Sequence, residues 1–159
     1  MSQKCNTTIL DNGTTKIPVD FEKCFQNKNF SALELPSNVT TDVIYEEITP
    51  RTDRWYSVLR FYPNGKVNYF SFPDKTAYTV DSFDPKIQGL RGRLVKSLKD
   101  GEDYVQLYTI IASNISWGIK TEAISVVGDE IRITNTSGHT SIFKKKIIPK
   151  EFLSYKANW

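Results

Sequence analysis

The chain has 159 residues, and 21 basic against 18 acidic side chains give it a formal net charge of +3. This length fits one domain that buries roughly two-thirds of the surface its unfolded form exposes. Charges of both signs are spread along the chain, whereas nucleic-acid-binding proteins concentrate basic residues in a stripe, so we expect no nucleic-acid partner. No run approaches the ~20 apolar residues of a membrane helix, so we expect no transmembrane segment.

Residues 1–38 mix Asn, Thr, Gly and Pro with isolated apolar positions and keep no lasting period. We therefore predict an irregular N-terminal segment that wraps around the rest of the chain. Both cysteines, Cys5 and Cys24, fall in this segment. A disulfide between them would close a loop of about 20 residues and stabilise the fold by about 3 kcal/mol in the chain-entropy model. Two free thiols fit the sequence as well, so both alternatives stay open.

Alternation of polar and apolar residues begins near Val39, and we predict a β-barrel domain over residues 39–159. Its first strand is expected over 39–48. The clearest local unit follows, because two strand-like runs flank Pro63-Asn64-Gly65. Proline presets its own φ and glycine accepts a positive one, so this unit predicts a hairpin of strands 55–62 and 66–72.

Residues 73–89 carry turn signals around a possible short strand, 76–80, and predict a long excursion over one mouth of the barrel. Three more hairpin-like units follow, with strands predicted over 90–98, 104–112, 117–127, 130–134 and 140–148. Strands joined in sequence by tight turns predict an antiparallel up-and-down meander, and closing it on itself removes the exposed edges.

The end of the chain combines a basic run with spaced aromatic residues. Residues 144–146 are three lysines in the last predicted strand, which is typical of an edge strand that lysines protect from pairing; an anion site is the alternative. Phe152, Tyr155 and Trp159 follow at spacings of three and four. They predict a short C-terminal helix or tail that packs against the barrel.

Two turn-centred motifs resemble those of bacterial lipocalin-like, calycin-type barrel proteins. Phe61-Tyr62-Pro63-Asn64-Gly65-Lys66-Val67 is similar to an early hairpin of such domains, and Ile124–Ile133, with its Gly128-Asp129 turn, is similar to their closing hairpin. The resemblance spans roughly residues 39–148. It implies an all-β, antiparallel up-and-down lipocalin-like barrel with one open end that admits a small, often apolar molecule. It offers no catalytic residue at a matching position.

The inventory of catalytic side chains is poor, so we predict that the protein is not an enzyme and uses no cofactor or metal. His139 is the sole histidine and lies in a turn, which excludes histidine relays and multi-histidine metal sites. Glu46 and Glu47 are adjacent, so on a strand they face opposite sides and do not form a pair. The acids of the turn 100–103 are either solvated or hold calcium. An enzyme that uses carboxylates alone is the remaining catalytic alternative.

Large apolar residues occur on both faces of several predicted strands, and rings mixed with Ser and Thr favour a semi-polar cavity in the barrel. We expect aromatic side chains to line this cavity and an arginine to anchor a polar group. The candidate ligand-binding residues are Trp55, Tyr69, Tyr104, Tyr108 and Trp117 for the lining, with Arg60 or Arg93 as the anchor. Core packing is the alternative for each of these aromatic residues.

Together these features predict a monomeric, non-enzymatic exported protein that binds a small apolar or amphipathic molecule. The alternative is an interaction module that docks a protein or a glycan through exposed aromatics and an edge strand. Export, whether to the medium, a periplasm or the cell surface, fits the polar start of the chain and its Asn-X-Ser/Thr triplets, which are either glycosylation sites or clusters of turn residues. These triplets begin at Asn6, Asn12, Asn29, Asn38, Asn114 and Asn135.

Overall fold

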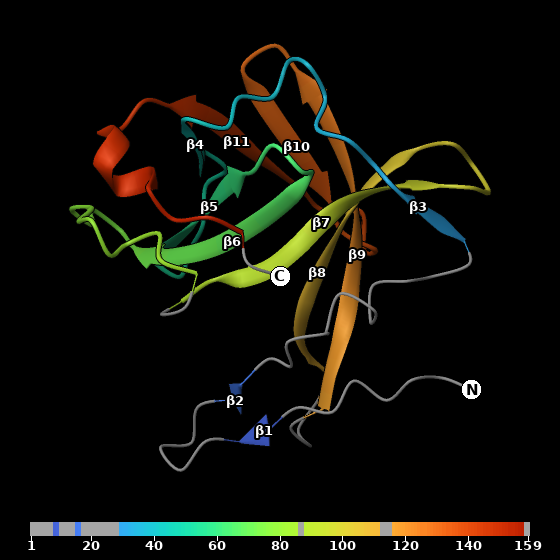
Figure 1. Ribbon diagram of the computed structural model, residues 1–159, viewed down its shortest axis with the longest axis horizontal. Coiled ribbons are helices and arrows are strands. Elements are labelled where there is room, and N and C mark those ends of the chain that lie inside the picture. The colour runs from blue at the N-terminus through green and yellow to red at the C-terminus, as the bar shows by residue number, and fades with distance from the viewer. Residues whose placement is uncertain (1–7, 10–14, 17–28, 86–87, 112–115, 158–159) are drawn as a thin grey trace.

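Eight strands form a closed antiparallel barrel in which each strand pairs with its neighbours in the chain and β11 pairs back onto β4 (Figure 1). This computed structural model describes residues 8–9, 15–16, 29–85, 88–111 and 116–157. It describes only the course of the backbone for residues 8–9, 15–16, 109–111 and 116–118. The barrel strands are β4 (Ile44–Glu47), β5 (Trp55–Phe61), β6 (Lys66–Pro73), β7 (Leu90–Ser97), β8 (Asp103–Ile111), β9 (Ser116–Val127), β10 (Glu130–Thr134) and β11 (Thr140–Lys146).

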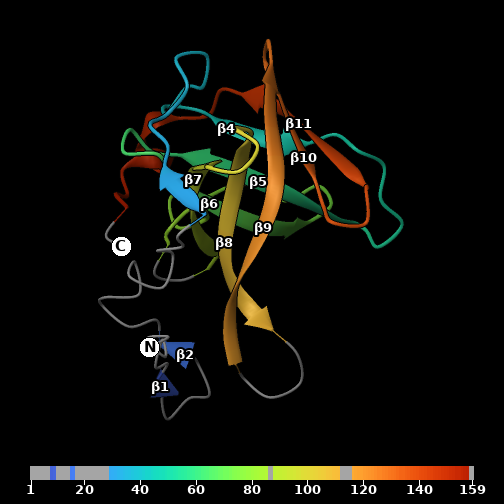
Figure 2. The ribbon, with the colours of Figure 1, turned by 90° about the vertical axis from the view of Figure 1, so that its right-hand side faces the viewer.

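The predicted all-β, up-and-down meander is confirmed, and the architecture is compatible with a lipocalin-like fold. Turn chemistry explains the hairpins. Gly65 has a φ of 77° in the turn between β5 and β6, and its N–H donates to the Tyr62 carbonyl at 3.0 Å. Gly128 has a φ of 60° in the turn between β9 and β10. Both positions need a backbone conformation that glycine adopts without steric cost. The hairpin of β8 and β9 extends past the other strands (Figures 1 and 2).

The predicted edge strand at the lysine run is wrong. Lys144 of β11 pairs with Glu130 of β10 on one side and with Glu46 of β4 on the other. Closure of the barrel therefore uses the backbone groups that an edge would leave unpaired. Two of the three lysines instead form ion pairs: Lys145 Nζ lies 3.3 Å from Asp129 Oδ1, and Lys146 Nζ lies 3.2 Å from Glu46 Oε1. The first strand is also shorter than predicted, since β4 covers only Ile44–Glu47 of the expected 39–48.

Two hydrophobic cores occupy opposite sides of the barrel wall. The first draws residues from all eight barrel strands and therefore fills the interior; it consists of Val39, Val43, Tyr45, Leu59, Phe61, Val67, Leu94, Val105, Leu107, Ile131, Ile133 and Phe143, with Leu33, Leu35, Tyr69, Ile124 and Val126 packed against them. The second, the outer cluster, uses only β4, β5 and β6 of the barrel; it consists of Ile44, Val58, Phe70, Phe72, Phe83 and Ile148, with Tyr56, Tyr78, Phe152 and Leu153 packed against them.

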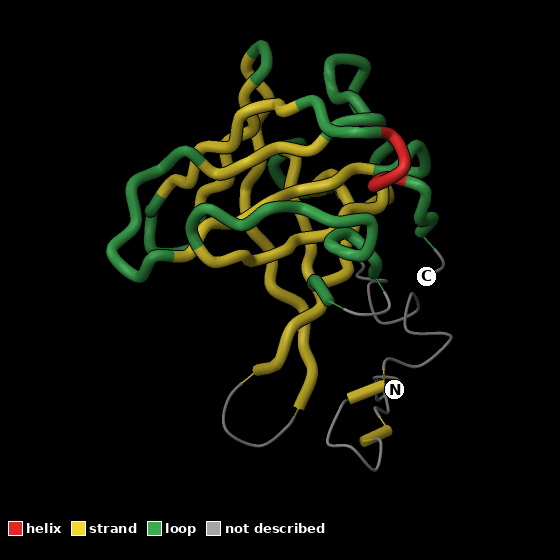
Figure 3. Tube along the Cα trace, turned by 90° about the vertical axis from the view of Figure 1, so that its left-hand side faces the viewer, coloured by secondary structure: helices red, strands yellow, loops and turns green. Residues whose placement is uncertain are grey.

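The excursion between β6 and β7 supplies part of this outer cluster, through Phe83 and Tyr78. Figure 3 shows loop segments that run across the strands on one side of the barrel. The excursion's predicted strand at 76–80 is wrong, because these residues form turns and irregular chain. Its predicted place over a mouth of the barrel is also wrong. The fully buried ring of Phe83 lies 5.4 Å from the ring of Phe70 and 5.0 Å from that of Tyr78. An irregular backbone allows both rings of the excursion to turn toward the sheet.

The segments before and after the barrel add short elements. In the N-terminal segment β1 (Thr8–Ile9) pairs with β2 (Thr15–Lys16), and β3 (Phe30–Ala32) pairs with β7. The predicted C-terminal helix is a 3-10 helix, η2 (Lys150–Leu153). Within the described part of the chain, no helix is long and apolar enough to span a membrane. The predicted disulfide partners Cys5 and Cys24, together with Trp159, lie outside the described residues.

Candidate functional site

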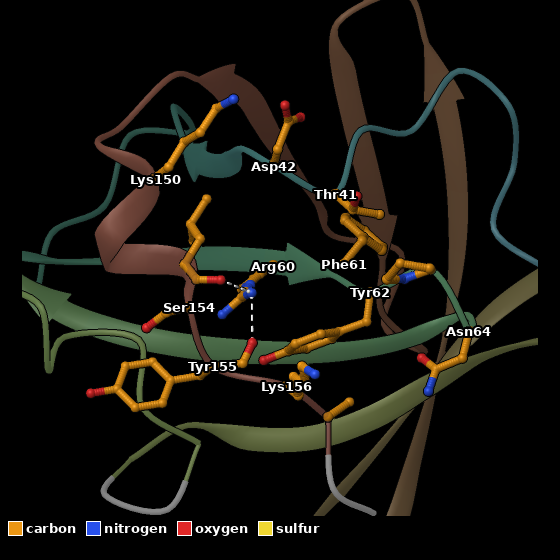
Figure 4. Close-up of a pocket in the computed structure, with 13 residues that line it drawn as sticks. Thr41, Asp42, Arg60, Phe61, Tyr62, Asn64, Lys150, Ser154, Tyr155 and Lys156 are labelled. Carbon is orange, nitrogen blue, oxygen red and sulfur yellow. Dashed lines mark hydrogen bonds between the residues drawn. The ribbon is translucent and has the colours of Figure 1, made fainter.

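A surface pocket of about 640 Å³ lies on the outer face of the barrel, between β5, the turn that follows it, and residues 153–157, here called the C-terminal tail (Figure 4). Its walls combine apolar and charged groups. They are formed by Thr41, Asp42, Arg60, Phe61, Tyr62, Pro63, Asn64, Lys150, Leu153, Ser154, Tyr155, Lys156 and Ala157. This volume suits a small organic molecule, since ligand pockets commonly measure about 300–1,000 Å³.

Alternation along β5 places Arg60 at this pocket. Leu59 and Phe61 belong to the interior core, whereas Val58 belongs to the outer cluster. Side chains two residues apart share a face of a strand, so Arg60 lies on the outer face with Val58. The predicted polar anchor is therefore on the outer side of the wall. The sequence does not reveal this, because every residue from Ser57 to Phe61 is buried and neither face of β5 is marked by polar exposure.

The guanidinium of Arg60 is deeply buried and only partly hydrogen-bonded. The residue is 5% exposed, and its Nη2 donates to the main-chain oxygens of Leu153 at 2.6 Å and Tyr155 at 2.8 Å (Figure 4). Its Nε and Nη1 are buried without an acceptor. None of the ion pairs among the described residues includes Arg60. A full positive charge thus lies against neutral partners, and burial lowers the pKa of this guanidinium.

Tyr62 fixes the guanidinium from one side. The central carbon of the Arg60 guanidinium lies 4.5 Å from the centre of the Tyr62 ring, within the range of a cation–π contact. The Tyr62 hydroxyl donates to Asn68 Oδ1 at 2.6 Å, which holds the ring in place. Burial raises the pKa of this hydroxyl to about 12, although nearby Arg60 and Arg91 oppose the rise. The ring and the guanidinium therefore form a fixed floor at the pocket.

The C-terminal tail is attached mainly through side chains. Leu153 packs against the outer cluster, and the Tyr155 hydroxyl donates to Asp81 Oδ1 at 3.0 Å. None of the backbone-to-backbone hydrogen bonds among the described residues involves residues 154–157. The hydrogen bonds from Arg60 are therefore a principal link between the tail and the barrel wall.

A second polar group lies inside the barrel, at its other end. The Glu47 side chain is 4% exposed, and its Oε1 accepts hydrogen bonds from the Ser57 N–H at 3.0 Å and Arg51 Nη1 at 3.2 Å. The Tyr69 hydroxyl donates to Ser57 Oγ at 2.6 Å. Glu46 faces outward, where its carboxylate accepts from Tyr78, so the prediction that the two adjacent glutamates point to opposite sides is confirmed. These contacts satisfy the buried carboxylate of Glu47 and tie β4 to β5.

A smaller pocket of about 220 Å³ lies at the barrel end that the segment 33–39 covers. It is lined by Leu33, Pro36, Asn38, Val39, Phe61, Leu94, Asp103, Ile124, Ser125 and Val126. Its neighbours in the interior core, such as Phe61 and Leu94, are almost fully buried. The space therefore lies at the mouth, against the packed interior core.

The structure does not gather the predicted aromatic lining into one cavity. Tyr69 packs against the interior core, with its ring 6.3 Å from that of Phe143, while Trp55 begins β5 and is 44% exposed. Tyr104 and Tyr108 alternate with inward-facing residues of β8 and so lie on the outer face.

Arg93 is likewise separate from the pocket at Arg60. Arg93 alternates with inward-facing Leu94 and lies on the outer face of β7. Trp117 lies in β9 opposite Ile110, and its side chain is outside the described atoms. Of the predicted ligand-binding residues whose side chains the structure describes, only Arg60 lines the larger pocket.

The predicted alternatives for metal binding find little support in the contacts of the turn 100–103. Asp100 accepts hydrogen bonds from the Glu102 N–H and the Tyr104 hydroxyl, both at 2.8 Å, and Asp103 pairs with Lys96 at 2.8 Å. The described residues contain no group of three or more side chains placed to hold a metal ion. His139 is exposed in its turn, as predicted.

Sequence reasoning missed the half of the pocket that the C-terminal tail provides. The spacing of Phe152 and Tyr155 indicated packing, and Phe152 does pack against the outer cluster. It did not indicate that Leu153 and Tyr155 would present main-chain oxygens to Arg60.

Comparison of the chain with protein-family models, with curated proteins and with solved structures found no match.

Proposed function

We propose that this protein is a non-enzymatic, exported binding protein of the lipocalin-like type, and that it holds a small amphipathic molecule in the pocket at Arg60. The observation that carries the proposal is the combination of a pocket of about 640 Å³ with a deeply buried, incompletely hydrogen-bonded arginine on its wall. Binding sites for small molecules combine apolar surface with polar groups that orient the ligand, and this pocket places Phe61, Pro63 and Leu153 beside charged side chains such as Arg60.

The site differs in place from the one expected of such a barrel. Large side chains with little or no exposure fill the centre of the barrel, among them Tyr45, Phe61 and Phe143. The outer pocket offers more room than the space of about 220 Å³ at the mouth. A ligand of ordinary size therefore fits better against the outer wall.

The alternative of an interaction module that docks through exposed aromatics is less well supported. It would use the outer face of β5 with Tyr56 and Tyr62, but Tyr62 is 4% exposed and Tyr56 packs in the outer cluster. It would also use the lysine run as an edge strand, and β11 is paired on both sides. The excursion and the C-terminal tail already cover the surface that a docked partner would need.

Native mass spectrometry of the protein purified from its own source tests the proposal. We expect a bound molecule of low mass that is released on unfolding, and the same intact mass reports a disulfide or attached sugars. Ser154→Trp fills the pocket from its exposed wall and should abolish retention, whereas Thr136→Trp, in the exposed turn between β10 and β11, should retain the molecule. Equal retention by both variants would place the ligand elsewhere and contradict the proposal.

A further inference from the structure

The acceptors on Arg60 differ in kind from those that a buried guanidinium usually has. Two neutral main-chain oxygens, those of Leu153 and Tyr155, take both hydrogen bonds that its Nη2 donates. Its remaining N–H groups, on Nε and Nη1, have no acceptor and no access to water. A buried charge is costly unless a charge of opposite sign compensates it, and a buried N–H is costly unless it is hydrogen-bonded. The site as it stands meets neither condition.

The surroundings of Arg60 favour an anion. Two exposed lysines, Lys150 and Lys156, line the same pocket, and Asp42 is the single acid among its lining residues. A cation–π contact with the Tyr62 ring favours this position of the guanidinium. Arginine binds the oxygens of carboxylates and phosphates more strongly than those of neutral carbonyls, because charge assists the hydrogen bonds.

The Tyr155 acceptor belongs to a segment with few links to the barrel. Residues 154–157 take part in none of the backbone-to-backbone hydrogen bonds of the described chain, and the contact of Tyr155 with Asp81 is exposed. Phe152 and Leu153 anchor the start of the tail in the outer cluster, so the residues after them can leave the wall without unfolding the barrel.

We propose that Arg60 recognises the acid group of an amphipathic organic anion, and that this group accepts from the unpaired Nη1 and replaces the Tyr155 main-chain oxygen on Nη2, while the anchored Leu153 stays in place. The inference rests on the proposed function and adds the chemical class of the ligand. The apolar part of the ligand lies along Pro63 and Leu153, and its acid group lies between Arg60 and the two lysines. The Tyr155 main-chain oxygen occupies part of the anion's place until the ligand arrives.

Calorimetry with three probes of equal chain length tests the inference: decanoate, decyl phosphate and decanol. We expect at least one of the two acids to bind on the order of tenfold more tightly than decanol. Arg60→Gln should remove that preference, and Arg60→Lys should keep part of it because it retains the charge. Arg132→Gln, which removes an exposed arginine on β10, is the matched control and should bind like the unaltered protein.

The carbon-13 resonance of the Tyr155 carbonyl gives a second readout in the unaltered protein, independent of whether the Arg60 variants fold. It should shift when an acid is added and stay unchanged with decanol. Equal affinity for the acids and the alcohol, or acid binding without the carbonyl shift, would overturn the inference while leaving the proposed function in place. Absence of binding by both acids at millimolar concentration would overturn the inference too, and the molecule that copurifies with the protein would then decide the proposed function separately.

Discussion

Phe83→Ala tests whether the excursion between β6 and β7 is part of the core. Phe83 is fully buried, and its ring lies 5.4 Å from that of Phe70, 5.7 Å from that of Phe72 and 5.0 Å from that of Tyr78. Truncation of a buried phenylalanine commonly costs about 3–5 kcal/mol through lost burial and the cavity left behind. We expect about 3 kcal/mol, the lower end, because the loop that carries Phe83 can partly close the cavity.

Urea unfolding followed by circular dichroism measures this loss as a lower midpoint with an unchanged slope. For a chain of this length each kcal/mol lowers the thermal midpoint by about 2–4 °C. Val80→Ala is the control, because Val80 lies in the same excursion but is 48% exposed. Its expected cost is within about 0.5 kcal/mol. If Phe83→Ala cost no more than Val80→Ala, the excursion would be a surface loop and the outer cluster would not exist as described.

Three further predictions concern other parts of the fold. Burial raises the pKa of Tyr62 to about 12, so the stability contributed by its neutral hydroxyl is complete below pH 10 and is lost as the pH rises toward 12. Urea unfolding across this range should show a smaller loss of stability for Tyr62→Phe than for the unaltered protein. An equal loss in both proteins would contradict the assignment. Glu47→Ala removes the acceptor of the buried Ser57 N–H, so we expect the free energy of unfolding to fall by about 1–3 kcal/mol in the same assay. An unchanged free energy of unfolding would show that water replaces the carboxylate. Gly92→Ala would drive a Cβ into the main-chain oxygen of Gln106 on β8, so we expect poor folding by circular dichroism. A native-like spectrum and stability would refute the close pairing of β7 and β8.

The strands and turns were the most predictable part of the molecule, because local chemistry determines them. Pro63-Asn64-Gly65 predicted a hairpin, and β5 and β6 lie on either side of this turn. The Gly128-Asp129 turn likewise predicted the hairpin of β9 and β10. In each case a glycine with positive φ separates two runs rich in β-branched and aromatic residues.

The choice between inner and outer faces was less predictable. Leu59 and Val58 are both fully buried, on opposite faces of β5, because the excursion and the C-terminal tail cover the outside of this part of the barrel. A covered outer face keeps the apolar residues that otherwise mark only the inside. Arg60 was therefore recognised as a polar anchor by its residue type, but its side of the wall depends on segments distant in the sequence.

The pocket itself depends on such distant contacts. Arg60 and Tyr155 are separated by 95 residues, and no local pattern links an arginine to main-chain oxygens so far along the chain. The possible strand at 76–80 failed for a related reason. Tyr78 is held by contacts with Glu46 and with the ring of Phe72 rather than by pairing with a neighbouring strand.

A crystal structure of the protein purified with the molecule it carries from its own source would test most directly whether the ligand site is outside the barrel wall. The account predicts electron density for a small molecule between Tyr62, Lys150 and the displaced Tyr155, with a polar group at the Arg60 guanidinium. Density enclosed among Tyr45, Leu59 and Phe143, with Tyr155 still hydrogen-bonded to Arg60, would contradict it.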